Sequence, residues 1–186
     1  RMVYPKGSEP GVTNALPGTV RFHGASSQAY VKKSFAITLN APASMVGMRT
    51  NAHWILNAAY IDRSLIRHKL AYDLFRSLST KNARRFAVDS RFVEARLNNR
   101  YHGVYLLMER MDRTLLELRP YHSNETSHAC IYKAVDHAAN FSQGGYSGYE
   151  QREPDPLTGV WWQPLAHFNR FVSSKPDGEF FHPQTG

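Results

Sequence analysis

Short apolar runs in the N-terminal third of the chain predict β-strands. The runs are rich in Phe, Val, Ile and Thr, and segments containing Gly or Pro separate them. The expected strands are residues 20–23, 34–39 and 53–60, with a loop at 40–52. In the second strand, alternation places Lys33 on the face of Phe35 and Ile37, so we expect Lys33 to point inward. Lys32 is expected to end that strand in solvent.

A helical period replaces these runs after Asp62. The apolar side chains recur at helical spacing and predict one stripe, formed by Leu65, Ile66, Leu70, Leu74, Phe75 and Leu78. Asp62 is expected to cap the first turn. The charged residues of the segment fall mostly outside the stripe, so we expect an amphipathic helix packed on the sheet by its apolar face.

The second half of the chain predicts a hairpin, a short strand and a second helix. Residues 90–99 and 104–111 are the hairpin strands, the latter buried on both faces, with a turn at 98–103. Residues 129–135 predict a strand, 140–160 predict loops, and 161–174 predict a helix that tolerates Pro164 in its first turn. The expected element order is three strands, a helix, two strands and a connector. The small lobe of a protein-kinase-like fold has this order.

Length and composition favour one globular domain, or one domain and part of another. The 186 residues are 42% hydrophobic and 20% charged, and no apolar run approaches the 18 residues that a membrane span needs. The single Cys130 excludes a disulfide within the chain. Because the chain starts at Arg1 and ends without an obvious structural stop, we expect it to be a fragment of a longer protein.

The charge balance raises the probability of an anionic partner. The formal net charge is +8, and sixteen of the 23 basic residues are Arg, whose guanidinium suits bidentate contact with phosphate or carboxylate. A genome that favours Arg codons is the alternative explanation of this high number of Arg residues. No nucleic-acid-binding motif is present, so we expect no nucleic-acid partner. The nine His show no metal-ligand spacing, and we expect no metal site built from them.

Four segments, in this order and spacing, resemble the CotH kinase family of spore-coat-protein-H-like atypical protein kinases. They are HGASSQAYVKKSFAITL, HWILNAAYIDRSLIRHKLAYDL, SRFVEARLNNRYHGVYLLMERMDR and IYKA. The resemblance runs from Arg21 to Lys133 and more loosely to Phe171. It implies an ATP- and Mg²⁺-dependent kinase that phosphorylates Ser or Thr of a Ser/Thr-rich coat or surface protein, in a spore-coat, envelope or extracellular setting.

The resemblance also implies a fold and its boundaries. We expect an α+β, atypical protein-kinase-like fold, mainly the small lobe with a twisted antiparallel sheet and one packed helix, plus the start of the large lobe. Residues 1–18 form a lead-in loop, 19–120 the nucleotide-binding lobe, and 121–186 a connector and partial second lobe. The acidic residues for catalysis and Mg²⁺ are expected beyond this chain.

Within that lobe, the resemblance and the local chemistry together suggest a nucleotide site. The turn residues and nearby cations are expected near the phosphates, and the end of the 104–111 strand is expected beside the adenine. The candidates are Gly24, Ser26, Ser27, Lys33, Arg67, Glu109, Met111 and Lys133. Gly24 permits unusual backbone angles, and a small-residue turn lets amide groups approach phosphate oxygens. The carboxylate of Glu109 is alternatively expected to pair with an Arg.

Some positions depart from the family pattern or have simpler interpretations. His23, Ala25 and Val31 stand where the family commonly has Arg, Asn and Pro. The turn is alternatively the polar tip of an ordinary hairpin. Asp136 to Asn140 imitates a kinase catalytic loop but with the wrong spacing, so we interpret it as a decoy. The aromatic residues between 146 and 171 are expected to be packing rather than a binding platform.

Two classes of function therefore remain open. The first is the ATP-binding part of a kinase, with this fragment alone expected to be inactive. The second is a non-catalytic surface or coat binding module, or a pseudokinase, with the same fold.

Overall fold

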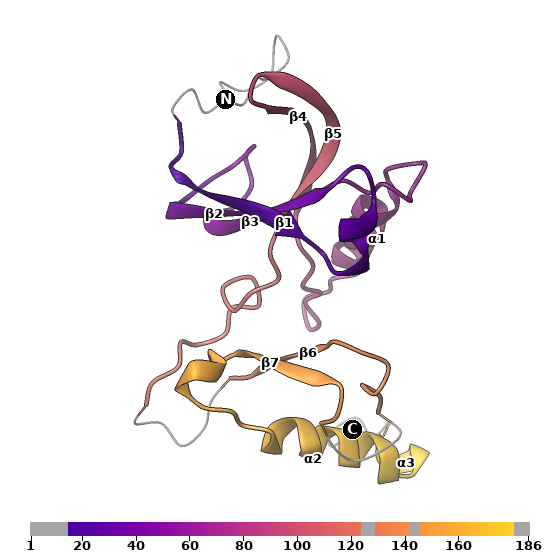
Figure 1. Ribbon diagram of the computed structural model, residues 1–186. Coiled ribbons are helices and arrows are strands. Elements are labelled where there is room, and N and C mark those ends of the chain that lie inside the picture. The colour runs from indigo at the N-terminus through magenta and orange to yellow at the C-terminus, as the bar shows by residue number, and fades with distance from the viewer. Residues whose placement is uncertain (1–14, 124–128, 142–145, 181–186) are drawn as a thin grey trace. The chain divides into compact units, whose positions relative to one another are not determined.

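A computed structural model describes residues 15–123, 129–141 and 146–180 (Figure 1). The chain divides into two compact units, Arg1–Leu115 and Leu116–Gly186. The expected lobe boundary lay close by, at residue 120. Most of the expected lead-in loop lies outside the described residues.

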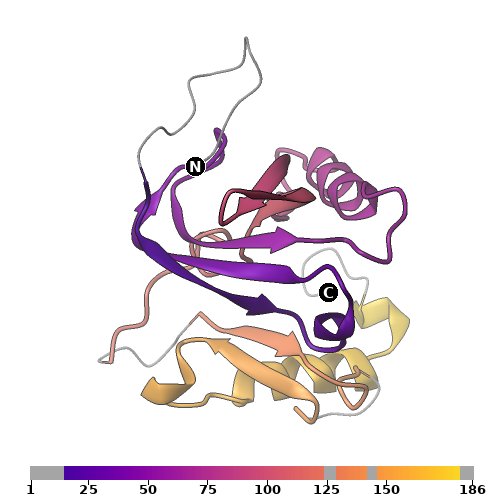
Figure 2. The ribbon, with the colours of Figure 1, turned by 45° about the horizontal axis from the view of Figure 1, so that its top comes forward.

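Unit 1 contains a five-stranded antiparallel sheet, visible in Figure 2. Its strands are β1 (Gly18–His23), β2 (Ser34–Ala43), β3 (Asn51–Asn57), β4 (Ser90–Leu97) and β5 (Arg100–Glu109), in the order β1-β2-β3-β5-β4. This confirms the strands and hairpin predicted from sequence. The β4–β5 turn is tighter than expected, because Asn98 and Asn99 have φ of 49° and 63°, the left-handed conformation of a short hairpin turn.

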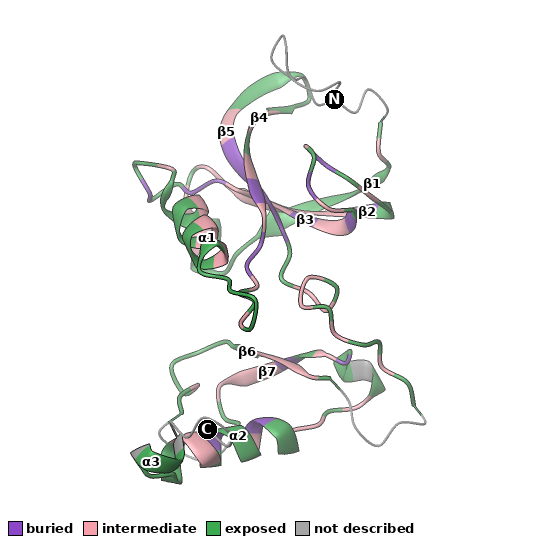
Figure 3. Ribbon diagram, turned by 180° about the vertical axis from the view of Figure 1, so that it is seen from behind, coloured by how far each residue is buried: buried purple, intermediate pink, exposed green. Residues whose placement is uncertain are grey.

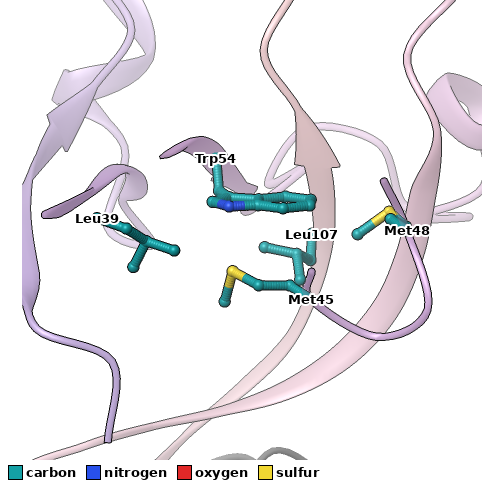
Figure 4. Packing of buried hydrophobic residues seen from close by; sticks show 5 residues of the cluster. All are labelled: Leu39, Met45, Met48, Trp54 and Leu107. Carbon is teal, nitrogen blue, oxygen red and sulfur yellow. The ribbon is translucent and has the colours of Figure 1, made fainter. Parts of the chain in front are cut away.

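The β2–β3 connection folds back to cover one face of the sheet. It supplies Met45 and Met48, which pack with Leu39, Trp54 and Leu107 (Figure 4). Trp54 is 1% exposed, and its indole Nε1 donates to the carbonyl of Asn51 at 2.9 Å. The segment predicted as a loop therefore contains both the extension of β2 to Ala43 and part of the core. This segment therefore helps to stabilise the sheet that carries the candidate site.

Helix α1 (Arg67–Ser77) is confirmed as a helix, but the expectation that its apolar stripe packs on the sheet is wrong. Leu70 and Leu74 are 61% and 58% exposed, and α1 is largely green in Figure 3. The helix instead directs charged side chains toward the start of β4: Lys69 Nζ donates to the Ser90 carbonyl at 3.3 Å. Within unit 1, α1 thus contacts the start of β4 through a charged side chain, while its apolar stripe is exposed.

The start of α1 is displaced from the expected position. Leu65 has φ of 61°, which a right-handed helix cannot contain, so regular helix begins at Arg67. The expectation that Asp62 is the N-cap is therefore wrong, because Ile66 occupies the N-cap position and makes no side-chain cap bond. Asp62 lies five residues before Arg67, and its Oδ2 accepts the amide of Arg67 at 3.0 Å.

Unit 2 contains a two-stranded antiparallel sheet and two helices. The elements are β6 (Ile131–Ala134), β7 (Tyr149–Glu153), α2 (Gln163–Ser174) and α3 (Asp177–Phe180). β7 occupies a stretch predicted as loop, and this prediction is wrong. The buried Gln151 side chain explains why the strand is held: it donates to the carbonyls of Pro154 and Gly159 and accepts the amide of Trp161. No helix in the described parts of the chain has the length and apolar character needed to cross a membrane.

Candidate functional site

The bend between β1 and β2 is a compact loop closed by its own side chains. It contains η1, a short 3₁₀ turn at Ser26–Ala29. Gln28 Nε2 donates to the carbonyl of Gly24, and Lys33 Nζ donates to the carbonyl of Gln28 at 2.6 Å. Four of the residues predicted for a phosphate site, Gly24, Ser26, Ser27 and Lys33, therefore belong to one small loop.

Gly24 is required by both the conformation and the packing of this bend. Its φ is 107°, a value that L side chains rarely adopt, and a Cβ at this position would collide with Ser27 Oγ. The first hydrogen bond of the turn runs from the amide of Gln28 to the carbonyl of Ala25 at 3.1 Å. The amides of Ser26 and Ser27 precede that bond, so the turn does not use them, and both residues are accessible.

A Gly24→Ala substitution is expected to lower the free energy of unfolding by about 1–3 kcal/mol through backbone strain alone, with the Ser27 collision adding to it. Gly47→Ala is the matched control, because Gly47 also has positive φ, 71°, but no atom lies within 4 Å of its Cβ position. We expect a cost of about 1 kcal/mol there. Urea denaturation of both variants measures the difference, and equal losses would show that the bend is not packed as described.

Lys32, rather than Lys33, is held against the sheet. Its Nζ donates to the carbonyl of Val104 on β5 at 2.5 Å and lies 4.3 Å from the centroid of the Tyr105 ring. Partial burial lowers the pKa of the Lys32 ammonium below the usual lysine value. The expectation that Lys32 ends the strand in solvent is therefore wrong. Residues 30–32 form a bend and β2 begins only at Ser34, so strand alternation does not extend to either lysine.

Arg67 lies at the end of the sheet where β3 leads into α1, and aromatic stacking ties that connection to the bend. The Tyr30 ring, directly after η1, stacks on Tyr60 with the centroids 5.4 Å apart. The Arg67 guanidinium is 80% exposed, and its Nε lies 3.5 Å from Asp62 Oδ1. The structure thus brings the bend and the β3–α1 connection together at Tyr30 and Tyr60, and Asp62 orients Arg67 further along that connection.

Glu109 lies toward the other end of β5, with its carboxylate buried. The side chain is 2% exposed, its Oε1 lies 2.8 Å from Arg49 Nε, and its Oε2 accepts the amide of Asp89 at 3.0 Å. The alternative that this carboxylate pairs with an Arg is confirmed. Val104 and Glu109 are roughly five residue steps apart along β5. At roughly 3.4 Å per step, the two ends of the predicted site lie about 17 Å apart. Met111, just beyond the strand, is exposed.

Arg49 also binds Asp112, a residue that no sequence pattern singled out. Asp112 Oδ1 lies 3.2 Å from Arg49 Nη2 and accepts the amide of Leu115 at 2.8 Å, and Oδ2 accepts Asn51 Nδ2 at 3.1 Å. Burial raises the pKa of Asp112, but these hydrogen bonds, a further one from Thr114 and the Arg49 charge outweigh it and leave the pKa below its usual value. The network fixes the chain where it leaves β5.

Acid is expected to destabilise unit 1 through Asp112 and two further carboxylates. The pKa of Asp62 is lowered chiefly by its hydrogen bond from Ser64, and that of Asp89 is lowered because bonds from Arg91 and Ser90 outweigh burial. A carboxyl group whose pKa is lower in the folded state than its unfolded value of about 3.9 stabilises the fold at pH values above about 3.9. This stabilisation is lost as the pH falls through the folded-state pKa.

We therefore expect the melting temperature to fall steeply as pH is lowered below about 4, and Asp112→Asn to flatten this dependence. Melting curves between neutral and strongly acidic pH measure the effect. Glu94→Gln, at an exposed position on β4, is the control and should keep the wild-type profile. An Asp112→Asn profile parallel to wild type would exclude this carboxylate as a source of acid sensitivity.

The remaining predicted residues lie in unit 2. Lys133, on β6, is exposed and pairs in register with Glu150 of β7. Asp136 Oδ1 accepts the amide of Ala138 at 2.7 Å, and Asn140 Nδ2 donates to the Ala138 carbonyl at 2.9 Å. These contacts stabilise a local turn, in agreement with the decoy interpretation of Asp136 and Asn140.

The aromatic residues of unit 2 stack on one another. Trp162 stacks with Tyr132 and Tyr146 at centroid distances of 5.7 and 4.9 Å, and Phe141 meets Phe168 edge-on at 5.6 Å. Three of these rings, Phe141, Tyr146 and Phe168, are 48%, 49% and 52% exposed, so the packing role expected from the sequence stays a prediction. In the described ranges, no group of three or more His, Cys, Asp or Glu is placed to hold a metal ion.

Comparisons with known proteins agree with the resemblance found in the sequence. A family model described as CotH kinase protein matches residues 20–182. The inner spore coat protein H of Bacillus subtilis (strain 168) is 33% identical over 123 residues, which are 66% of this chain and 30% of that protein. The aligned segment therefore spans less than a third of this relative.

Proposed function

The chain belongs to the CotH kinase family, and we propose that it forms the ATP-binding part of an atypical protein kinase. In this proposal the parent protein transfers a phosphate group from ATP to Ser or Thr hydroxyls of a Ser/Thr-rich protein. The relative's name, inner spore coat protein H, supports a location in a spore coat.

The observation that carries the proposal is a partly buried lysine beside a glycine-dependent bend. Lys32 uses one of its three N–H donors on the Val104 carbonyl, which leaves donors for a phosphate oxygen. The bend offers the amides of Ser26 and Ser27 and their hydroxyl groups. Phosphoryl transfer depends on such positioning and charge neutralisation rather than on covalent participation of the protein.

Other candidates of unit 1 complete this centre in the proposal. Lys33 and Arg67 add positive charge at the bend end of the sheet, and Lys133, which lies in unit 2, is not assigned to it. The backbone near Glu109 and Met111 contacts the adenine. The separation of about 17 Å along β5 suits an extended nucleotide, which reaches from the one end to the other, better than a single phosphate.

Mg²⁺ is expected to accompany the nucleotide. When bound, it neutralises charge on the transferred phosphate. ATP phosphates and water supply most of its ligands, so one or two protein carboxylates suffice. Among the described residues no group of three or more His, Cys, Asp or Glu is placed to hold a metal ion, and we assign none of them to Mg²⁺.

A pseudokinase or non-catalytic coat module is the second candidate. The contacts from Lys33 and Gln28 into the bend are those of an ordinary polar hairpin tip, which favours this reading. The test incubates the complete parent protein with γ-labelled ATP, Mg²⁺ and a Ser-rich peptide. A kinase labels the peptide, a pseudokinase binds ATP without transfer, and a coat module does neither.

A further inference from the structure

The outward side of α1 is a contiguous apolar surface. Leu70, Leu74 and Leu78 follow at four-residue spacing, so they lie on one side of successive turns, and they are 61%, 58% and 57% exposed (Figure 3). Phe75, three residues before Leu78, is 45% exposed, and Ile66 at the start of the helix is 49% exposed. We call these five residues the leucine face. Single exposed apolar residues are ordinary, but a continuous row of them marks an interaction surface.

The opposite side of α1 attaches the helix to unit 1 through charged groups. Asp73 is paired with Lys69 at 2.7 Å and with Arg76 at 2.5 Å. Arg76 also lies 3.1 Å from Asp89, and Lys69 Nζ donates to the Ser90 carbonyl at 3.3 Å. These contacts hold α1 at the start of β4 and leave the leucine face directed outward.

The charges at the ends of the leucine face are positive. Arg63 and Arg67 lie at the start of α1, Lys81 lies beyond its last turn, and all three are exposed. Among the described residues, neither Arg63 nor Lys81 has an ion-pair partner. The acids between residues 60 and 82 are Asp62, which is buried, and Asp73, which is paired on the opposite side. A complementary surface therefore combines apolar side chains with carboxylates at its two ends.

We propose that the leucine face binds an acidic amphipathic helix of a partner protein. The 11 residues of α1 extend about 16 Å, which three turns of a partner helix cover. Apolar side chains at helical spacing pack on the leucines, and acidic side chains at both ends meet the cations. A second copy of this chain fits less well. In a two-fold pair, Arg63 and Arg67 of one copy would face Lys81 of the other, so like charges would oppose one another.

The test measures binding of fluorescent helical peptides to the 186-residue chain by anisotropy. The first peptide has leucines at helical spacing between glutamates, the second has lysines in place of the glutamates, and the third is a scrambled form of the first. The scrambled peptide keeps the negative charge, so it measures attraction to the formal net charge of +8 alone. We expect the first peptide to bind at least roughly tenfold more tightly than the others, because it matches both the leucines and the cations.

Leu74→Ala should weaken binding of the first peptide about tenfold, because Leu74 is central in the leucine face. Its side chain is 58% exposed and alanine favours a helix, so the variant should remain folded, which circular dichroism checks. Leu97→Ala is the matched control, because Leu97 is 50% exposed on β4, and should leave the affinity unchanged. The double variant Arg63→Gln, Lys81→Gln should weaken binding about threefold, and high salt should remove that difference.

Equal binding of the first and scrambled peptides, or equal losses in Leu74→Ala and Leu97→Ala, would overturn the proposal. A chain that is dimeric by light scattering and becomes monomeric on Leu74→Ala would make a second copy the occupant instead. Binding of the peptide by the 186-residue chain but not by the complete parent protein would show that the parent itself covers the face. Each of these results rejects the partner protein. None of the measurements involves ATP, so they leave the proposed kinase function to its own test.

Discussion

Lys32→Ala is expected to weaken ATP binding by roughly ten- to a hundredfold, the cost of one charge-assisted hydrogen bond to a phosphate. The Lys32 ammonium is fixed against β5 by the Val104 carbonyl, so it can meet a phosphate without first being ordered. Lys33→Ala should cause a smaller loss, because the Lys33 ammonium already closes the bend on the Gln28 carbonyl. The two adjacent substitutions remove the same charge and differ only in position.

Isothermal titration of the parent protein with Mg²⁺-ATP measures both affinities. A thermal shift with the same ligand checks that each variant is folded. If Lys33→Ala loses more affinity than Lys32→Ala, the original sequence interpretation is correct and the assignment of Lys32 is rejected. If neither substitution changes the affinity, the nucleotide phosphates lie elsewhere.

Arg49→Ala should lower the free energy of unfolding by about 3–5 kcal/mol, the usual cost of leaving one partner of a buried ion pair uncompensated. Glu109 is 2% exposed, and its Oε1 would lose the Arg49 Nε that lies 2.8 Å away. Asp112 would lose the same guanidinium.

Urea denaturation measures this loss. Arg110→Ala is the matched control, because Arg110 follows Glu109 directly but is exposed, and its substitution should cost less than about 0.5 kcal/mol. A loss of less than 1 kcal/mol in Arg49→Ala would show that water or another cation satisfies Glu109. Arg49→Lys keeps the positive charge but lacks the planar guanidinium. Its loss in free energy of unfolding should therefore fall between the losses of Arg110→Ala and Arg49→Ala.

The sheet of unit 1 was predictable because its signals are local. Alternation in β2 and the Asn98–Asn99 turn of the β4–β5 hairpin are decided by residues that are neighbours in sequence. The orientation of α1 was not predictable in the same way. Its apolar stripe suggested packing on the sheet, but the acceptors at the start of β4 belong to a distant segment, and Lys69 turns toward them.

The candidate site likewise has parts that the sequence predicts and parts that it does not. Gly24, Ser26 and Ser27 could be grouped from sequence, because one turn contains them. The exchange of roles between Lys32 and Lys33 depends on a bend before β2 that no periodicity reveals. The Arg49–Glu109 pair joins segments far apart in the chain, so composition could suggest an arginine partner for Glu109 but could not identify it.

A crystal structure of the parent protein with Mg²⁺ and a non-hydrolysable ATP analogue tests the central claim most directly. We expect the terminal phosphates within hydrogen-bonding distance of the Ser26 and Ser27 amides and of Lys32 Nζ, and the base beside the backbone that follows Glu109. Phosphates bound at another place, with Lys33 still donating to the Gln28 carbonyl and Lys32 to that of Val104, would contradict it.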